Sequence, residues 1–440
     1  MKIPEHLDGL SKRDIVRYVL SLEARIEEQQ KEIDELKRHL LAYENAHTPP
    51  SQQRHYPKRE KNGKGKLGAP KGHEGMTREQ PEPTESKKLS LDVCPCCNKP
   101  LGKPKRMERR VIEELPEPQP LRVIEFLIPH YFCQHCQKEV VPAHPELPET
   151  GNLGYDLQSQ IAMMKFEDRM PHRKISSSLN RQYGLTLCPA TILDVLRRVA
   201  DRLSSFYEKI KQDIRNSHVV NSDETGAKVQ GKKHWFWTFI TATVVLFCFS
   251  HKREHKMVED VLGTEYQGLL GCDGWKAYEK HATLIQRCWA HLLREAEFLA
   301  EKHEGQAKLL YKTLKKMFKK IKKITLETPL KTREKTYNKL LNELRSWAQT
   351  CKAYTELKKL ATTIENGINY WLTCVLHPEI EPTNNRAERA LREFVVQRKI
   401  TGTLRNEKGT RITETIMTAI ATWKLQGYNP YRMLRTTLSS

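Results

Sequence analysis

Two aspartates follow short apolar stretches of this sequence, and a glutamate lies on a polar segment that reads as a helix. Asp223 lies at the predicted end of the short strand with which VVNSDETGAKVQG, residues 219–231, begins, and Asp273 follows the strand-like apolar run 269–272. Glu388 lies in a helical pattern for which Asn384, after Pro382, is the predicted N-cap. Such carboxylates would repel one another unless cations lay between them, and Mg²⁺ is the natural choice. Two ions about 3.5–4 Å apart could then coordinate the attacking and leaving oxygens of a phosphoryl transfer reaction.

Each acid also has a purely structural explanation. An aspartate after a strand is often a turn residue. Glu388 could be a solvated partner of Arg389 or Arg392 on the same helix. Spacing alone leaves both interpretations open.

Two pairs of cysteines form a second candidate site. Cys94 and Cys97, and Cys133 and Cys136, are each separated by two residues, as in metal-binding turns. Four thiolates suit a closed, tetrahedral structural Zn²⁺ site, so we expect a zinc ribbon over residues 91–146. Cys96 is a surplus thiol that could replace Cys94 or Cys97 as a ligand.

Apolar runs around Asp223 predict the strands that would position it. The segment HWFWTFITATVVLFCFS, residues 234–250, contains two such runs broken near residues 241–243. Both faces of these runs are apolar, as in central strands that helices cover on both sides. The segment is short for a membrane span, and lysines and an arginine flank it. We expect a protein without a membrane segment, located in the cytoplasm.

Charge and the amino-terminal segments suggest a polyanionic partner and a dimer. The net charge is +21, spread over many segments, and nucleic acid is the commonest partner of such a chain. Apolar residues in a heptad pattern favour a parallel two-stranded coil, although a single amphipathic helix is the alternative: Val19, Leu22, Ile26, Ile33, Leu36, Leu40 and Tyr43. Residues 48–90 are rich in Gly, Pro, Lys and Arg and predict a flexible basic linker.

Residues 156–208 have the organisation of a helix-turn-helix. The first helix is expected to end near Tyr183 and Gly184, and Pro189 to open the second. Ile192, Val195, Leu196 and Val199 would face inward, which leaves Thr191, Asp194, Arg197 and Arg198 outward. Arg197 and Arg198, with Arg173 and Lys174 in the first helix, are candidate DNA contacts; an ordinary two-helix connector is the alternative.

Several short motifs, which occur in order along the sequence, resemble those of the IS66 family of bacterial and archaeal insertion-sequence transposases. They are DETG at 223–226, CDGWKAY at 272–278, CWAHLLRE at 288–295 and NNRAERALR at 384–392. PPSQ at 49–52, GAPKGHEG at 68–75 and the two cysteine pairs resemble the amino-terminal half of that family. The resemblance implies a ribonuclease H-like, mixed-sheet catalytic domain with the strand and helix order β-β-β-α-β-α-β-α.

The resemblance also implies roles for individual residues. Asp223, Asp273 and Glu388 would be the catalytic acids that bind Mg²⁺, with Mn²⁺ as a substitute. Cys288 and His291 would lie near the active centre, and we expect His291, Asn384 and Arg389 to support it or position DNA; a buried core histidine is the alternative for His291. In residues 301–378, an expected all-helical insertion, one helix face is apolar, lined by Leu310, Leu314, Met317, Phe318, Ile321 and Ile324. Lys315, Lys316 and Lys319 are among the lysines that crowd the rest of that helix, and they could hold transposon-end DNA or be solvated.

These expectations give a multidomain α+β and α/β protein. The predicted parts are a coiled-coil segment (1–47), the linker (48–90), the zinc ribbon (91–146), the helix-turn-helix (151–212), the catalytic core (213–300), the helical insertion (301–378) and the final core helix with a tail (379–440).

The expected activity is cleavage at the ends of an insertion sequence and joining of the freed 3′-OH ends to target DNA. The partners would be the terminal inverted repeats and target DNA, a second copy of the chain or more, and accessory proteins of the same element. Two alternatives remain: an inactive DNA-binding regulator, and a structure-specific nuclease on the same fold.

Overall fold

The computed structural model describes residues 11–43, 82–113 and 120–440. The chain divides into two units, Arg54–Leu121 and Met1–Gln53 together with Arg122–Ser440, and each is described by itself. Most of the predicted basic linker, up to residue 81, lies outside the described residues. None of the helices in the described ranges is long and apolar enough to cross a membrane.

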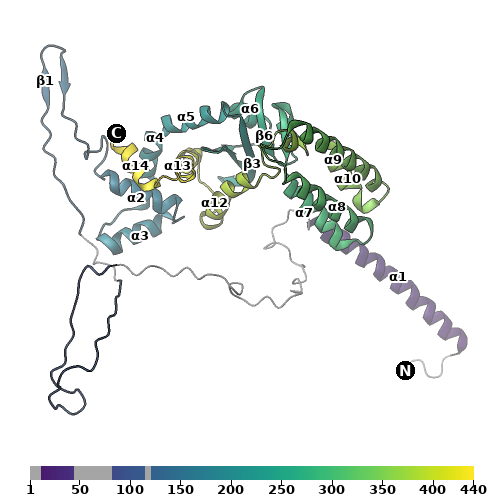
Figure 1. The fold of residues 1–440 in the computed structure, drawn as a ribbon, viewed down its shortest axis with the longest axis horizontal. Helices are drawn as coiled ribbons and strands as arrows, with labels where there is room; N and C mark the ends of the chain where they lie inside the picture. The colour runs from purple at the N-terminus through teal and green to yellow at the C-terminus, as the bar shows by residue number, and fades with distance from the viewer. Residues whose placement is uncertain (1–10, 44–81, 114–119) are drawn as a thin grey trace. The chain divides into compact units, whose positions relative to one another are not determined.

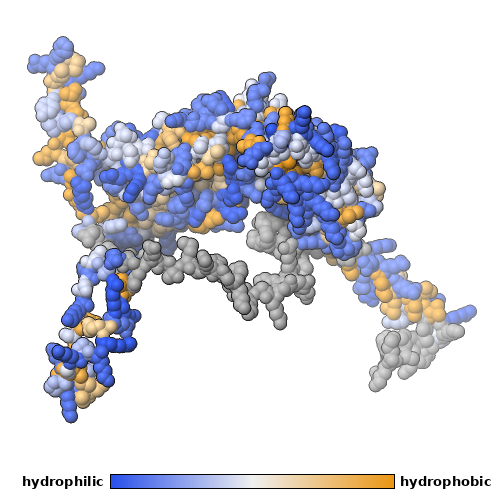
Figure 2. All heavy atoms as spheres, viewed as in Figure 1, coloured by the Kyte–Doolittle hydropathy of each residue, from blue (hydrophilic) through white to orange (hydrophobic). Residues whose placement is uncertain are grey.

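Helix α1 spans Lys12–Tyr43 and carries the predicted heptad pattern (Figure 1). Its apolar side chains are accessible within this single chain: Ile26 is 64% exposed and Ile33 44%. Figure 2 shows them as hydrophobic patches along the helix. The side chains of Leu40 and Tyr43 lie outside the described set. An apolar stripe that its own chain leaves accessible is what a helix needs to pair with another helix.

Four helices precede the main sheet. They are α2 (Tyr155–Phe166), α3 (His172–Tyr183), α4 (Pro189–Arg202) and α5 (Ser204–Arg215). As predicted, α3 ends at Tyr183, and Gly184 follows it with φ 67°, a left-handed conformation that suits glycine. Pro189 opens α4, also as predicted, and the four residues predicted to face inward are at most 1% exposed.

A five-stranded mixed sheet lies at the centre of the larger unit (Figure 1). Its strands are β3 (Val219–Val229), β4 (Lys232–Ile240), β5 (Val245–Ser250), β6 (Tyr266–Cys272) and β7 (Ala282–Arg287). The order is β5-β4-β3-β6-β7, with antiparallel pairs among β3, β4 and β5 and parallel pairs from β3 to β6 to β7. This confirms a mixed sheet in an α/β protein.

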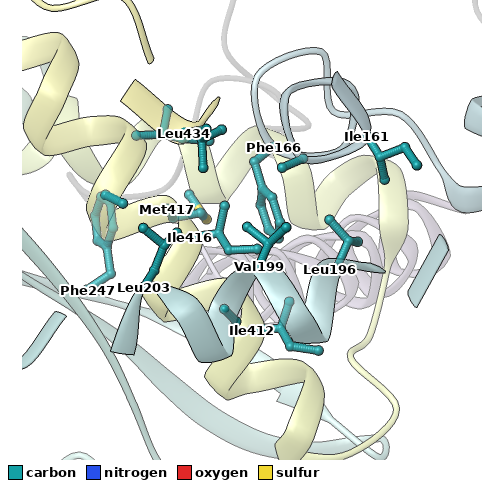
Figure 3. Packing of buried hydrophobic residues seen from close by; sticks show 14 of the residues in the cluster. Ile161, Phe166, Leu196, Val199, Leu203, Phe247, Ile412, Ile416, Met417 and Leu434 are labelled. Carbon is teal, nitrogen blue, oxygen red and sulfur yellow. The ribbon is translucent and has the colours of Figure 1, made fainter. Parts of the chain in front are cut away.

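Both faces of the sheet are covered, as the apolar runs predicted. Phe236 on β4 packs with α12, α13 and the amino-terminal helices, whereas its neighbour Trp237 packs with α5 and α6 on the other face. Figure 3 shows the first of these cores, in which α2 and α4 contribute Phe166 and Val199 beside Ile416 and Met417. Successive strand residues point to opposite faces, so a doubly apolar strand is buried on both sides.

The remaining helices cover the sheet and form the insertion. They are α6 (Lys256–Leu262), α7 (Trp289–Lys302), α8 (Gln306–Ile321), α9 (Leu330–Cys351), α10 (Lys358–Asn366), α11 (Thr373–Leu376), α12 (Asn385–Thr401), α13 (Glu407–Leu425) and α14 (Pro430–Ser439), with short 3₁₀ helices η3 (Lys276–Lys280) and η4 (Thr355–Leu357). Throughout residues 301–378, all of them described, the regular elements are helical. Helices α7 to α11 share a separate apolar core.

Helix α13 protects the edge of the sheet. The backbone N–H groups of Val245, Phe247 and Phe249 on edge strand β5 donate to the side chains of Thr422, Thr418 and Glu414, at 3.1, 3.0 and 3.0 Å. These three acceptors are spaced four residues apart on one face of α13. The helix therefore satisfies donors that an edge strand would otherwise offer to another chain.

Replacing Glu414 by Gln should flatten the pH dependence of stability. Burial raises the pKa of Glu414 to about 7. The folded state thus holds a proton that the unfolded chain loses above its ordinary pKa, so wild-type stability falls as pH rises from about 4.5 to about 7. Gln does not titrate, so the variant lacks this loss. The free energy of unfolding of Glu414→Gln, measured with urea, should therefore rise relative to that of the wild type by about 2 kcal/mol between pH 5.5 and pH 8.

The matched control for Glu414→Gln is the same change at exposed Glu327. That variant should follow the wild-type pH dependence throughout. Parallel pH profiles for Glu414→Gln and wild type would contradict the assignment of a raised pKa to Glu414.

Candidate active site

A cavity of about 640 Å³ opens beside β3, β6, α7 and α12. Its charged and polar lining includes Asp223, Glu224, Arg253, Asp273, His291, Arg294, Glu388 and Arg392. All three acids singled out in the sequence line this one cavity. They come from a strand, a strand end and a helix that are far apart in the chain.

Asp223 and Asp273 lie close together, with carboxylate oxygens of Asp223, Glu224 and Asp273 all within 4.8 Å of one another. Asp273 directly follows β6, as predicted. The prediction that a strand ends at Asp223 was wrong: β3 continues to Val229, because it stays paired with β4 beyond that point. The parallel pairing with β6 reaches only Asn221, so Asp223 lies where the neighbouring strand stops.

Glu224 is a third acid of this group that the sequence reasoning missed. Its side chain is 1% exposed. It accepts hydrogen bonds from the hydroxyl of Tyr278 at 2.6 Å and from Nε of Arg253 at 2.7 Å. Burial, with the charge of Asp273, raises the pKa of Glu224, and burial with the charges of Glu224 and Asp273 raises the pKa of Asp223 well above its usual value. The position of Glu224 next to Asp223 in the DETG motif was the signal from which the sequence could have identified it.

Arg253 provides a positive charge at these carboxylates. It lies in the loop after β5, ion-pairs with Glu224, and contacts Oδ2 of Asp273 at 3.4 Å. Its guanidinium also lies over the rings of Trp235 and Trp275, 5.1 and 4.7 Å from their centres. A planar cation held between aromatic rings and carboxylates partly offsets the repulsion among the acids.

Glu388 lies in the same cavity but belongs to a neighbouring group. Ligand atoms of Cys288, His291 and Glu388 all lie within 4.8 Å of one another, and Nδ1 of His291 is 3.6 Å from Oε1 of Glu388. Cys288 immediately precedes α7, and His291 lies in the first turn of that helix. Burial lowers the pKa of His291, although the Glu388 charge opposes the shift. Burial raises the pKa of the Cys288 thiol.

Asn384 precedes α12, but its side chain does not cap that helix as the sequence predicted. Its Nδ2 donates to the carbonyl of Ser222 at 2.7 Å, and its Oδ1 accepts from Nδ2 of Asn221 at 3.1 Å. Its backbone N–H donates to Sγ of Cys288 at 3.2 Å. Asn384 therefore ties the start of the helix that carries Glu388 to the strand that carries Asp223.

Arg389 is exposed on α12, whereas Arg294 and Arg392 line the cavity. The sequence reasoning named Arg389 as a site residue, considered Arg392 only as a solvated partner of Glu388, and passed over Arg294. Helical spacing offered a signal, because Arg392 follows Glu388 by four residues and Arg294 follows His291 by three.

The basic residues predicted to contact DNA are mostly accessible. Arg173, Lys174, Lys315, Lys316 and Lys319 are exposed. Arg197 is exposed but ion-paired with Asp194 at 2.7 Å. Arg198 differs from the prediction of an outward side chain, since that side chain is only 18% exposed and pairs with Asp194 at 2.9 Å.

Each cysteine pair lies in its own tight turn. The Cys94 turn is closed by an isolated bridge between Val93 and Pro100, and Cys133 ends β1 (Tyr131–Cys133), which pairs with β2 (Lys138–Val140). Hydrogen bonds from backbone N–H groups within each turn lower the pKa of Cys94 and of Cys133. This environment favours thiolates. The two turns belong to different units, and a shared zinc ion remains a prediction.

Comparison with known proteins shows which family the chain belongs to. The chain is 23% identical over 389 residues to "Uncharacterized protein y4jD" of Sinorhizobium fredii (strain NBRC 101917 / NGR234), an alignment that covers 79% of this chain and 74% of that protein. Residues 150–412, more than half of the chain and the whole region that contains the cavity, match the transposase IS66 family. The chain belongs to the IS66 family of transposases.

Proposed function

We propose that this protein cleaves DNA at the ends of an insertion sequence and joins the freed 3′-OH ends to target DNA. One observation carries the proposal: three carboxylates, Asp223, Glu224 and Asp273, converge within 4.8 Å in a cavity that Glu388 also lines, in a chain of a transposase family. Phosphoryl transfer depends mainly on positioning and charge neutralisation, so it needs no side-chain nucleophile.

The order of strands supports a ribonuclease H-like catalytic domain. Three antiparallel strands are followed by two strands parallel to the first, in the order β5-β4-β3-β6-β7. This matches the element order that the resemblance implied except between β6 and β7, where the 3₁₀ helix η3 stands in place of an α-helix. Acids on the adjacent parallel strands β3 and β6 are expected to meet in such a sheet.

The acid group fits Mg²⁺ or Mn²⁺. Its donors are carboxylate oxygens, which hard divalent cations prefer. Burial, together with the charges of the neighbouring carboxylates, raises the pKa values of Asp223 and Glu224, so a cation between them would stabilise their charged forms. Asp223 and Asp273 would hold the first ion, with Glu224 beside them, and Glu388 would help hold a second. Bound ions supply a nucleophilic water or hydroxyl and neutralise the phosphate during displacement.

The other cavity residues would act on DNA by binding and orientation. Arg294 and Arg392 offer planar, always charged groups for phosphate oxygens. His291, whose pKa is lowered by burial, would be neutral near pH 7 and would position Glu388. Arg253 would keep Glu224 and Asp273 in place until divalent cations bind.

DNA would be held mainly by phosphate contacts outside the cavity. The helix pair α3 and α4 fits a helix-turn-helix, with Arg173 and Lys174 exposed at the start of α3. The lysines of α8 lie opposite its buried face, formed by Leu310, Leu314, Met317 and Ile321. Arg197 and Arg198 are paired with Asp194, so a DNA phosphate would share or compete for their guanidinium N–H groups.

The four predicted zinc ligands, Cys94, Cys97, Cys133 and Cys136, would form a structural zinc ribbon. Short turns and hydrogen-bonded thiols in both pairs support this assignment. A closed four-sulfur site would stabilise a segment that has little apolar core of its own.

An assay with labelled inverted-repeat ends, a target plasmid and Mg²⁺ tests the proposed function. Joined products that require divalent metal would support it. DNA binding without cleavage would favour an inactive regulator, and cleavage without joining would favour a structure-specific nuclease.

Helix α1 is proposed to pair with α1 of a second copy. Replacing Ile26 by Asp would place a charge in the apolar seam and should convert a dimer into a monomer, measured by analytical ultracentrifugation. Ala24→Asp puts the same charge two residues away, outside the predicted seam, and should leave the dimer intact. Equal masses for the two variants would contradict pairing through this face.

A further inference from the structure

A second group of metal-ligating side chains lies outside the cavity. His255, Glu259 and His281 each offer one ligand atom, and these atoms all lie within 4.8 Å of one another. The proposed transposase function does not use them.

The three side chains come from two elements that are adjacent in space. His255 immediately precedes α6, and Glu259 lies one turn later, with its backbone N–H donating to the His255 carbonyl at 3.1 Å. Positions four apart on a helix share one face, so both side chains point to the same side. His281 follows η3, directly before β7, and is only 9% exposed.

Hydrogen bonding fixes the tautomer of His281. Its Nδ1 lies 3.2 Å from the carbonyl oxygen of Thr264, which can only accept, so Nδ1 carries the hydrogen. In the neutral ring, Nε2 then presents a lone pair toward His255. Histidine ligands of metals commonly donate their second ring N–H to a backbone carbonyl in this way.

The separation of the two ring nitrogens also fits a shared metal. Nε2 of His281 lies 3.2 Å from Nδ1 of His255. A tetrahedral ion with Zn–N bonds of about 2.0–2.1 Å would hold two nitrogens roughly 3.3 Å apart. A direct hydrogen bond between the rings is the competing explanation of this distance, and it gives Glu259 no role.

We propose that His255, Glu259 and His281 form a binding site for a transition metal, with Zn²⁺ as the best fit. Two imidazoles and one carboxylate match the ligands of Zn²⁺, whereas Mg²⁺ prefers oxygen ligands throughout. A solvent molecule would occupy the fourth position.

Metal at this site would tie the start of α6 to the start of β7 and would anchor the loop before α6. Arg253, which ion-pairs with Glu224 and contacts Asp273, lies in that loop two residues before His255. A metal outside the cavity would therefore fix the position of Arg253 relative to Glu224 and Asp273.

Metal counting on the full chain tests this site. The parent chain carries Asp273→Asn, which weakens metal binding at the acid group in the cavity. It is compared with two double variants, in which His255→Gln or Glu259→Gln is added to Asp273→Asn. After dialysis against a chelator and Zn²⁺ reloading, both added changes should remove one equivalent of zinc per chain. His303→Gln, which removes an exposed imidazole elsewhere, should remove none.

Co²⁺ substitution separates this site from the cysteines. The parent should show the visible bands of tetrahedral Co²⁺ without thiolate charge transfer from this site, and both variants should lose these bands while any thiolate-to-cobalt band stays. Zn²⁺ should raise the melting temperature of the parent more than that of the variants, and all chains should melt alike in chelator.

Two results would overturn the proposal. One is an unchanged zinc count in His255→Gln and Glu259→Gln. The other is a parent chain whose bound cobalt shows thiolate bands only, a result that does not depend on how the variants fold. Either would leave a metal-free hydrogen bond between His255 and His281. Neither measurement depends on DNA cleavage. The metal-site proposal can therefore be wrong while the proposed transposase function is right, and the function can be wrong while the metal site is right.

Discussion

Replacing Asp273 by Asn is expected to reduce DNA cleavage and joining by at least about 1,000-fold while DNA binding persists. Oδ1 of Asp273 accepts the backbone N–H of Trp275 at 2.9 Å, and the Asn oxygen can keep that bond. Arg253 keeps its contacts with Glu224. The substitution therefore removes one negative charge from the cation-binding group with little change in local structure.

The measurements are cleavage and strand transfer with labelled ends, and DNA affinity by mobility shift. Affinity should be equal to or slightly tighter than that of the wild type, since the variant is less negative. Asp168→Asn, at an exposed position between α2 and α3, is the matched control and should cleave normally. Wild-type cleavage by Asp273→Asn would remove this residue from the mechanism.

Replacing Asn384 by Ala is expected to cause the second-largest effect, on stability and activity together. The variant loses both side-chain hydrogen bonds to β3, and the buried carbonyl of Ser222 and amide of Asn221 lose these partners. The loss should lower the free energy of unfolding by about 2–4 kcal/mol. Cleavage should fall about tenfold or more, because Glu388 on α12 is no longer fixed relative to Asp223.

Asn429→Ala is a matched control for this prediction. Asn429 also precedes a helix, α14, but its side chain accepts the backbone N–H of Arg432 and so acts as an ordinary cap. Its removal should cost about 1 kcal/mol and leave cleavage unchanged. If Asn384→Ala lowered unfolding free energy and cleavage no more than Asn429→Ala, Asn384 would not be the link between helix and strand.

Local patterns in the sequence predicted the elements of this protein well. Continuous apolar runs predicted β4 and β5, Gly184 and Pro189 marked the turn between α3 and α4, and a 3.6-residue pattern marked the buried face of α8. These features depend on neighbouring residues, so they can be read along the chain. The family words pointed to Asp223, Asp273 and Glu388 before any fold was known.

Tertiary structure decided which side chains meet. Strand β3 continues past Asp223 because it pairs with β4, Asn384 bonds to β3 because Gly271 on β6 leaves room for Asn221, and Arg198 is drawn into an ion pair with Asp194. Glu224, Arg253, Arg294 and Arg392 line the cavity beside the predicted acids although their local sequence gave only weak signals. The sequence by itself determined the family and most of the elements, and it pointed to the three acids proposed here, because these depend on local periodicity and on short motifs. The partners of each acid depend on contacts between residues far apart in the chain, and only the folded protein decides those.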